Sequence, residues 1–161
     1  MADPKERATM IVFDGDLDKA MASFIIATGA AAMGKQVTMF FTFWGLNVLR
    51  KDNVISGSKK NFMEKMFEKM MPRGPEKLGL SKMNYAGMGP KMMKKMMKNH
   101  NVSSLKEMIE MAQELDVKMV ACTMSMDVMG LKEEELIDGL EYAGVASYLA
   151  EAEDSNINLF I

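Results

Sequence analysis

Short apolar runs alternate along this chain with segments of helical character, and this alternation constrains its fold more than any other feature. Thr9–Phe13 is rich in strand-forming residues and ends at an Asp-Gly-Asp turn. Asp16 is placed to cap a helix over Leu17–Met33, and Gly34 is placed to end it. Val37–Phe43 is apolar almost throughout, which is typical of a parallel strand covered on both faces. The start of the chain therefore predicts a strand–helix–strand unit.

The same rhythm returns after residue 100. Ser103 or Ser104 can cap a helix that runs to about Leu115, with Glu107 available for a capping box. The elements expected after it are a strand over Val117–Ala121, a short helix from Ser125 to Met129 that ends at Gly130, a helix over Lys132–Asp138, a strand over Leu140–Tyr142, a helix over Val145–Glu153 and a final buried strand over Asn158–Ile161. Strands that alternate with helices predict an α/β fold, with a parallel sheet, right-handed crossovers and helices on both faces.

Charge divides the chain unevenly. The formal net charge is −2 over 161 residues, but residues 59–98 hold eleven Lys or Arg against three acids, together with ten of the 21 methionines. Apolar residues in this window repeat at helical spacing with lysines on the other faces, which predicts two basic amphipathic helices. Their apolar positions are Phe62, Met63, Met66, Phe67, Met70 and Met71 in the first, and Met92, Met93, Met96 and Met97 in the second. We expect one domain over residues 1–161, with a Met- and Lys-rich helical insertion at about residues 52–100.

The counts of cysteine and histidine exclude several function classes. One cysteine cannot form an intramolecular disulfide, and one cysteine with one histidine cannot supply a four-ligand zinc site. A hydrolase with a catalytic histidine would have to use His100, which follows a lysine-rich helix end where the helix dipole already favours a cation. We therefore expect neither a metal nor a cofactor.

The chain carries no obvious targeting signal. Residues 1–7 are polar, without the apolar region of a cleavable signal peptide. The longest uncharged stretch, residues 20–34, is shorter than the ~20 residues that a membrane-spanning helix needs. A cytoplasmic protein is the default expectation.

Cys122 is the first candidate for chemistry. It stands where the predicted strand over Val117–Ala121 stops, and ligands collect at the carboxyl ends of strands in open parallel sheets. A helix that begins just behind it would stabilise a thiolate through its N-terminal amides. The alternative interpretation is a buried small hydrophobic residue, which is the usual state of a lone cysteine.

Several stretches of the chain resemble a known family, the DsrE/DsrF-like sulfur-trafficking proteins, and in particular its DsrE2-type branch, also labelled a sulfurtransferase or peroxiredoxin-like group. The similarity extends over nearly the whole chain, and the two most specific strings are Phe-Phe-Thr-Phe-Trp-Gly-Leu and Cys-x-Met-Ser-Met-Asp-x-Met-Gly. The stretches that carry the resemblance are Asp14–Lys19, Gly29–Gly34, Phe40–Leu46, Cys122–Gly130 and Gly144–Leu149.

The resemblance implies a three-layer α/β/α fold with a five-stranded parallel sheet, assembled into homo-oligomers such as trimers or hexamers. It also implies that Cys122 carries sulfur as a persulfide between donor and acceptor proteins or small thiols. Asp14 departs from the family, in which a small polar residue is often found at this position. A carboxylate close to Cys122 would oppose formation of the thiolate.

Cysteine chemistry agrees with this expectation. A persulfide carrier needs one thiolate that takes a sulfane sulfur and passes it to an acceptor thiol. A dithiol redox enzyme needs a resolving cysteine, which this chain lacks. Peroxide reduction is disfavoured because no Lys or Arg lies between Lys118 and Lys132 to support the thiolate. Sulfur transfer is therefore the first hypothesis.

Residues on two segments could line the pocket of Cys122. Thr123, Ser125 and Met126 follow it directly, although helix capping and core packing explain them as well. Trp44 and Asn47 follow the second strand and could reach the same end of the sheet, although a lone Trp is more often part of a core.

The Met-rich helices support an alternative function as an oligomeric binding or adaptor module, in which Cys122 is structural. Their face could bind a protein partner, or lie on a membrane surface, which ranks lower. Soft thioethers could also bind Cu(I), through Met63, Met66 and Met70 or through Met92 and Met96. Nucleic acid is disfavoured, because the lysine stripes lack interleaved aromatic residues for stacking.

Overall fold

A computed structural model describes residues 6–52 and 60–161 of the chain. Residues 1–5 and 53–59 lie outside the described ranges. The second of these segments falls at the start of the predicted insertion. The strands are β1 (Arg7–Val12), β2 (Gln36–Phe41), β3 (Lys118–Cys122), β4 (Glu141–Ala143) and β5 (Ile157–Phe160). The helices are α1 (Leu17–Ala32), α2 (Phe62–Met70), α3 (Met88–Asn99), α4 (Leu105–Glu114), α5 (Thr123–Met129) and α6 (Val145–Glu153), with short 3-10 helices η2 (Phe43–Leu49), η3 (Tyr85–Gly87) and η4 (Glu133–Glu135).

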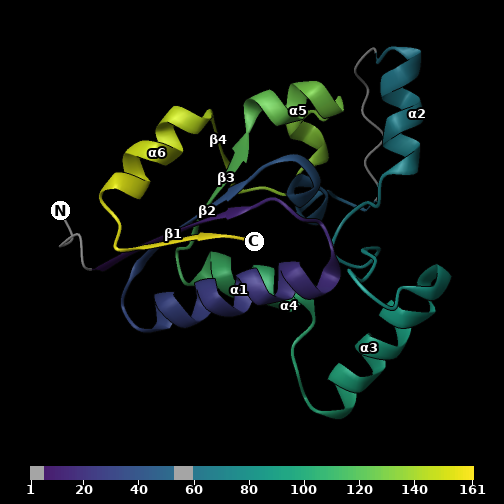
Figure 1. The fold of residues 1–161 in the computed structure, drawn as a ribbon, viewed down its shortest axis with the longest axis horizontal. Helices are drawn as coiled ribbons and strands as arrows, with labels where there is room; N and C mark the ends of the chain where they lie inside the picture. Colours follow the sequence, from purple (N-terminus) through teal and green to yellow (C-terminus); the bar gives the residue numbers. More distant parts are fainter. Residues whose placement is uncertain (1–5, 53–59) are drawn as a thin grey trace.

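The five strands form one parallel sheet in the order β4-β3-β2-β1-β5. The chain steps outward from β1 to β4 and then returns to place β5 beside β1. Helices α1 and α4 cover one face of this sheet, and α5 and α6 lie on the other side (Figure 1). The predicted α/β/α fold with a five-stranded parallel sheet is therefore confirmed. The first and last strands in chain order, β1 and β5, lie side by side in this sheet.

Two apolar clusters hold the layers together. The larger cluster fills the space between the sheet and the α1/α4 layer, and it includes Met10, Phe24 and Met119. A smaller cluster lies under α6 and contains Phe40 and Tyr148, whose ring centroids are 5.2 Å apart. Successive residues of a strand contribute side chains to the two clusters in turn, because successive side chains point to opposite faces of a sheet. This alternation decides which side of the sheet each candidate residue faces.

Most predicted element boundaries lie within two residues of the observed ones. Asp16 is the N-cap residue of α1, although its side chain makes no capping hydrogen bond. Gly34, at φ 84°, follows the end of α1 and lets the chain turn back into β2. Ser104 and Glu107 form the expected capping box at the start of α4. Local capping signals therefore located these helix ends correctly.

The second strand is shorter than predicted. It ends at Phe41, and the chain turns into η2 at Phe43, which has a φ of 46°. Gly45 permits this turn, because a Cβ atom there would lie 2.1 Å from the carbonyl oxygen of Val12. The backbone of η2 thus packs directly against the end of β1. Apolar composition alone did not reveal this close approach.

Two further predictions were wrong. The helix expected over residues 132–138 is only the 3-10 turn η4, because Leu136 then pairs with Arg50 in an isolated antiparallel bridge. The last strand, β5, was expected to be buried, but it is an edge strand with Phe160 68% exposed. Its position beside β1 alone leaves one side of it open.

The segment between η2 and α4 contains the two predicted basic helices. Helix α2 begins with a capping box formed by Asn61 and Glu64, and none of its residues is buried. Helix α3 begins earlier than its methionine pattern indicated, at Met88, and it buries only Pro90 and Met97. Figure 1 shows both helices projecting from the layered body of the protein. Among the described helices, none is long and apolar enough to cross a bilayer.

Candidate functional site

Cys122 lies at the carboxyl end of β3 and is the N-cap residue of α5. It is a free cysteine, only 3% exposed, and it packs in the small cluster under α6 with Phe40, Val120 and Tyr148. The predicted position at a strand end is therefore correct in the structure. The sulfur lies beneath apolar side chains, so both interpretations of a lone cysteine keep a structural basis.

A row of residues crosses the sheet at this end, in β4 and β3 and just after β2 and β1. The pairing of Cys122 with Ala143 and of Ala121 with Phe41 places Thr42 next to Cys122. The pairing of Phe41 with Val12 places Phe13 beyond Thr42. Thr42 has an extended backbone, φ −136° and ψ 153°, so the alternation of side chains continues through it. Thr42 and Cys122 therefore face the same side of the sheet.

Thr42 also contacts α5. Its Oγ1 lies 2.6 Å from the Oγ of Ser125, which is fully buried. Either hydroxyl can donate in this pair, and the second hydroxyl hydrogen is then left for another acceptor. The sequence predicted Ser125 at the site but missed Thr42, which lies within an apolar run that reads as strand.

The other two residues of α5 that were predicted at the site, Thr123 and Met126, lie in different surroundings. Thr123 is exposed, whereas Met126 is 5% exposed and packs in the larger cluster. The Ser125 hydroxyl links α5 to Thr42, the residue that follows β2. The helix separates the three side chains because successive residues point in different directions around its axis.

Asp14 follows β1, which is separated from β3 by β2. Its carboxylate pairs with the Lys19 ammonium, and Asp16 lies 3.8 Å from the same ammonium. The hydrogen bond that Lys19 donates to Asp14 raises the pKa of Lys19. The Asp14 carboxylate is therefore compensated by a cation of α1.

Trp44 and Asn47 both belong to η2, but their side chains lie in different surroundings. Trp44 is 43% exposed, and its ring lies 6.2 Å from the ring of Phe67 in α2. Asn47 is buried, and its Oδ1 accepts a 3.5 Å hydrogen bond from Nη1 of Arg50. The structure thus places Asn47 in a buried polar cluster, not beside Cys122.

That cluster was not predicted from the sequence. The Lys60 ammonium lies 2.7 Å from Glu135 and 3.0 Å from Glu68, and Arg73 also pairs with Glu68. The Nη2 atom of Arg50 lies 3.9 Å from Glu135 and has no hydrogen-bond partner among the described residues. Burial and the neighbouring Arg73 cation lower the pKa of Arg50. No local pattern signals this cluster, because its members come from four separate segments.

Burial raises the pKa of Glu68, but hydrogen bonds from Lys60 and Arg73 outweigh it and hold that pKa below its usual range. The carboxylate is therefore charged at neutral pH. It pairs with Arg50, which follows η2, and with Lys60, which in turn pairs with Glu135 of η4.

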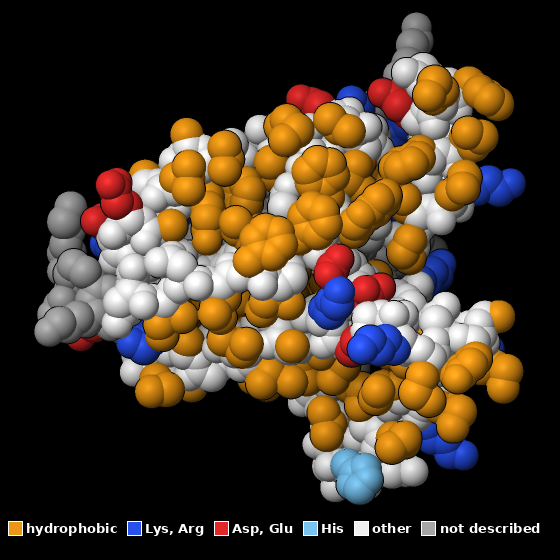
Figure 2. All heavy atoms as spheres, viewed as in Figure 1, with side chains coloured by type: hydrophobic (Ala, Val, Ile, Leu, Met, Phe, Trp, Pro, Cys, Tyr) orange, Lys and Arg blue, Asp and Glu red, His pale blue; other side chains and the backbone are white. Residues whose placement is uncertain are grey.

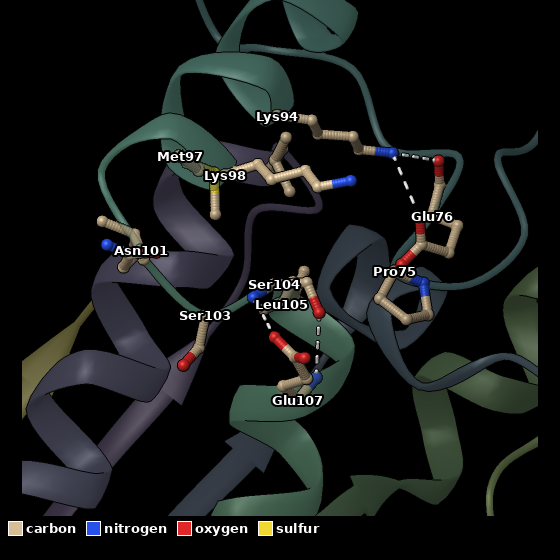
Figure 3. A pocket seen from close by; sticks show the side chains of 12 residues that line it. Pro75, Glu76, Lys94, Met97, Lys98, Asn101, Ser103, Ser104, Leu105 and Glu107 are labelled. Atoms are coloured by element: carbon tan, nitrogen blue, oxygen red, sulfur yellow. Dashed lines mark hydrogen bonds and ion pairs between the residues drawn. The ribbon is translucent and has the colours of Figure 1, made fainter.

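Three cavities formed by the described residues have no Cys122 in their lining. One, of about 530 Å³, lies between α3 and the start of α4, and Figure 3 shows the side chains that line it. Two smaller ones lie at the opposite, amino-terminal end of the strands, near Lys35 and Lys118. Access to the Cys122 sulfur therefore requires movement of the side chains above it.

Potential metal ligands do not gather anywhere in residues 6–52 and 60–161. No group of three or more His, Cys, Asp or Glu side chains there could hold an ion. His100 is the exposed C-cap residue of α3.

Large apolar side chains are exposed around the end of the sheet that carries Cys122. Figure 2 shows hydrophobic side chains gathered over this end of the molecule and over α2 and α3. On α5, α6 and β5 the exposed residues are Met124, Val128, Val145, Leu149 and Phe160. Exposed apolar areas of this kind mark surfaces that contact other molecules.

The fold and the buried thiol at a strand end define a class of open parallel α/β proteins with a single cysteine at the carboxyl edge of the sheet. Residues 4–160 match the model of the DsrE/DsrF/DrsH-like family, and the chain belongs to that family. The resemblance seen in the sequence is thereby confirmed.

Two relatives match along the full chain. One is an uncharacterized protein of Bacillus subtilis, YrkE, which is 62% identical over 161 residues and covers 100% of both chains. The other is the sulfur carrier protein DsrE2 of Allochromatium vinosum, which is 38% identical and covers 98% of this chain and 99% of its own.

Two solved structures share the fold. Protein MTH1491 of Methanobacterium thermoautotrophicum has a TM-score of 0.54 at 12% identity, and covers 98% of this chain and 100% of its own. The ychN protein of E. coli has a TM-score of 0.53 at 11% identity, and covers 96% and 99%. At these identities the comparison concerns the fold alone.

Proposed function

We propose that this protein relays sulfur and carries a sulfane sulfur as a persulfide on Cys122. The Cys122 thiolate attacks the outer sulfur of a donor persulfide, the donor leaves as a thiolate, and Cys122 gains an S–SH group. An acceptor thiolate then attacks that outer sulfur and releases the Cys122 thiolate. Donor and acceptor are proteins or small thiols, and no net oxidation or reduction occurs.

The position of the only cysteine supports this proposal most directly. Cys122 lies at the carboxyl edge of a parallel sheet, where such folds place their reactive groups. The 38% identical relative is named as a sulfur carrier, which agrees with a relay role. The Thr42–Ser125 hydroxyl pair beside the thiol offers a hydrogen bond to a sulfur anion.

Intact mass spectrometry tests the proposal. The protein is incubated with a sulfane-sulfur donor, and we expect Cys122 to gain the mass of one sulfur atom, which dithiothreitol then removes. Cys122→Ser and Cys122→Ala provide the matched controls. The proposal fails if the native protein gains no more mass than these variants.

We include assembly and location in the proposal. Membership of the family implies a homo-oligomer, a trimer or a hexamer, and the exposed apolar side chains near Cys122 agree with an oligomer. A cytoplasmic location is the default that accompanies this proposal. Light scattering after size exclusion would give the assembled mass, and a monomer at micromolar concentration would contradict this part.

A second candidate function, that of a binding module, is supported by the exposed methionines of α3. The methionines of α3 are exposed along one stripe, with Met88 64%, Met92 63% and Met96 56% exposed. A binding module would use this stripe to hold a protein partner, a membrane surface or Cu(I), with Cys122 structural. Under this function, changing the three methionines to Gln abolishes binding of the partner, whereas Cys122→Ser leaves it intact.

A further inference from the structure

The cavity of about 530 Å³ between α3 and α4 lies apart from Cys122 in the fold. It is enclosed by α3, the chain that leads into α4, the loop at Pro75 and Glu76, and the first residue of α1, Leu17. Its volume of about 530 Å³ falls within the roughly 300–1,000 Å³ of small-molecule sites. Helices α1 and α4 both begin at the carboxyl end of the sheet, where ligands of this fold class bind.

The interior of this cavity is apolar. Leu17 and Leu105 are 1% and 2% exposed, and Met97 is 8% exposed. These three side chains come from α1, α4 and α3, so the cavity forms only where the three helices meet. Pro75 and Val102 extend the apolar surface toward the opening.

Charged side chains surround the opening, and most are already compensated. Nζ of Lys94 lies 3.5 Å from the Glu76 carboxylate and also donates to its backbone oxygen. Glu107 is occupied by the capping box, in which it accepts from the Ser104 amide at 2.7 Å. Figure 3 shows both pairs as dashed contacts at the edge of the cavity.

Lys98 differs from these groups. It lines the cavity but has no ion pair among the described residues, and Figure 3 shows its side chain extending across the space between α3 and α4. The charged lining is balanced, with Lys94 and Lys98 against Glu76 and Glu107, but Lys98 alone of the two lysines has no ion pair among the described residues. Lys98 is therefore available to pair with one anionic group on a ligand that is otherwise apolar.

We propose that this cavity binds a small amphiphilic carboxylate. The carboxylate pairs with the Lys98 ammonium, and the apolar body of the ligand packs on Leu17, Met97 and Leu105. An ion pair at the edge of an apolar cavity is less screened by solvent than one on the open surface. The proposal is independent of sulfur relay, because Cys122 does not line the cavity.

Methionine methyl groups provide the test. The protein is labelled with 13C at the methionine methyl groups and titrated with octanoate, and Met97→Leu assigns the Met97 signal. We expect the Met97 resonance to shift and saturate, while those of the exposed Met92 and Met96 change little. Lys98→Gln should weaken octanoate binding about tenfold, as for loss of one charge-assisted contact.

Lys95→Gln is the matched control, because Lys95 lies on the same helix but does not line the cavity. It should leave octanoate binding unchanged. Two results would overturn the proposal: shifts of equal size at Met92, Met96 and Met97, or equal affinities of the Lys98→Gln and Lys95→Gln variants. Binding of 1-octanol as tight as that of octanoate would overturn the role of the carboxylate.

Discussion

The hydroxyl pair of Thr42 and Ser125 lies at the end of the sheet that carries Cys122. The thiol packs against Phe40, Val120 and Tyr148, none of which carries a charge. The Thr42 hydroxyl lies in the same row of the sheet and is held by Ser125. Because the pair leaves one hydroxyl hydrogen free, we expect Thr42 to support a sulfur anion by hydrogen bonding.

Replacing Thr42 tests this expectation. Thr42→Val keeps the branched shape but removes the hydroxyl, and it should slow alkylation of Cys122 by iodoacetamide about tenfold at fixed pH. Thr42→Ser should keep the native rate, because it retains the hydroxyl. Equal rates for the native protein and Thr42→Val would show that the hydroxyl does not act on the sulfur.

At the scale of elements, α2 is attached to the protein mainly by charge. None of its residues is buried, and its Glu68 accepts hydrogen bonds from Lys60 and Arg73 beneath it. Phe67 adds one ring contact to Trp44. A helix without a buried face depends on such contacts, because apolar burial supplies most of the stability of helices in proteins.

Neutralising Glu68 should therefore release α2. In Glu68→Gln the cations Arg50, Lys60 and Arg73 lose the carboxylate that they share, and we expect a loss of about 2 kcal/mol in the free energy of unfolding. Trp44 is the only tryptophan of the chain, so its fluorescence reports loss of the Phe67 contact through stronger quenching by acrylamide. Glu64→Gln, which can preserve the capping box, should quench as the native protein does.

Helix α3 is the least enclosed of the longer helices. Only Pro90 and Met97 are buried along it, and it carries Lys91, Lys94, Lys95 and Lys98.

We propose that residues 52–100 form an insertion into one domain that spans residues 1–161. Limited trypsin digestion should then cut within α3 first and leave the sheet intact. Early cleavage within β1, β2 or β3 would contradict this organisation.

At the scale of the whole molecule, pH acts through ion pairs that link separate elements. Glu151 of α6 accepts hydrogen bonds from Lys118 of β3 and Thr38 of β2. Burial raises the pKa of Glu151, but these bonds outweigh it and hold its pKa below the ordinary 4.5. The same balance holds for Glu68. As pH falls, the unfolded chain takes up these protons before the folded one does.

Stability should therefore be complete above about pH 4.5 for these two carboxylates and fall as pH drops through their lower folded pKa values. Glu151→Gln should lower the free energy of unfolding by about 1 kcal/mol at pH 7 and flatten its decline at acid pH. Urea unfolding between pH 3 and pH 7 measures both effects. An unchanged acid slope in this variant would show that Glu151 titrates alike in both states.

The parts of the fold that the sequence predicted depend on local signals. The end of α1 at Gly34 and the capping box of Ser104 follow from backbone requirements within a few residues. The position of Cys122 at a strand end follows from the same short-range pattern. The helix expected over residues 132–138 failed because Leu136 pairs with a distant segment at Arg50, which no local pattern reveals.

By itself, the sequence determined the order of strands and helices, the parallel sheet and the lone cysteine at its edge, because apolar periodicity and capping act over short distances. Only the tertiary structure decided which side chains meet. It placed Thr42 beside Cys122, moved Asn47 into the cluster with Arg50, and formed a cavity where Leu17, Met97 and Leu105 converge. These contacts join residues far apart in the chain, and the packing of the crossovers sets them, not the residue pattern of any single element.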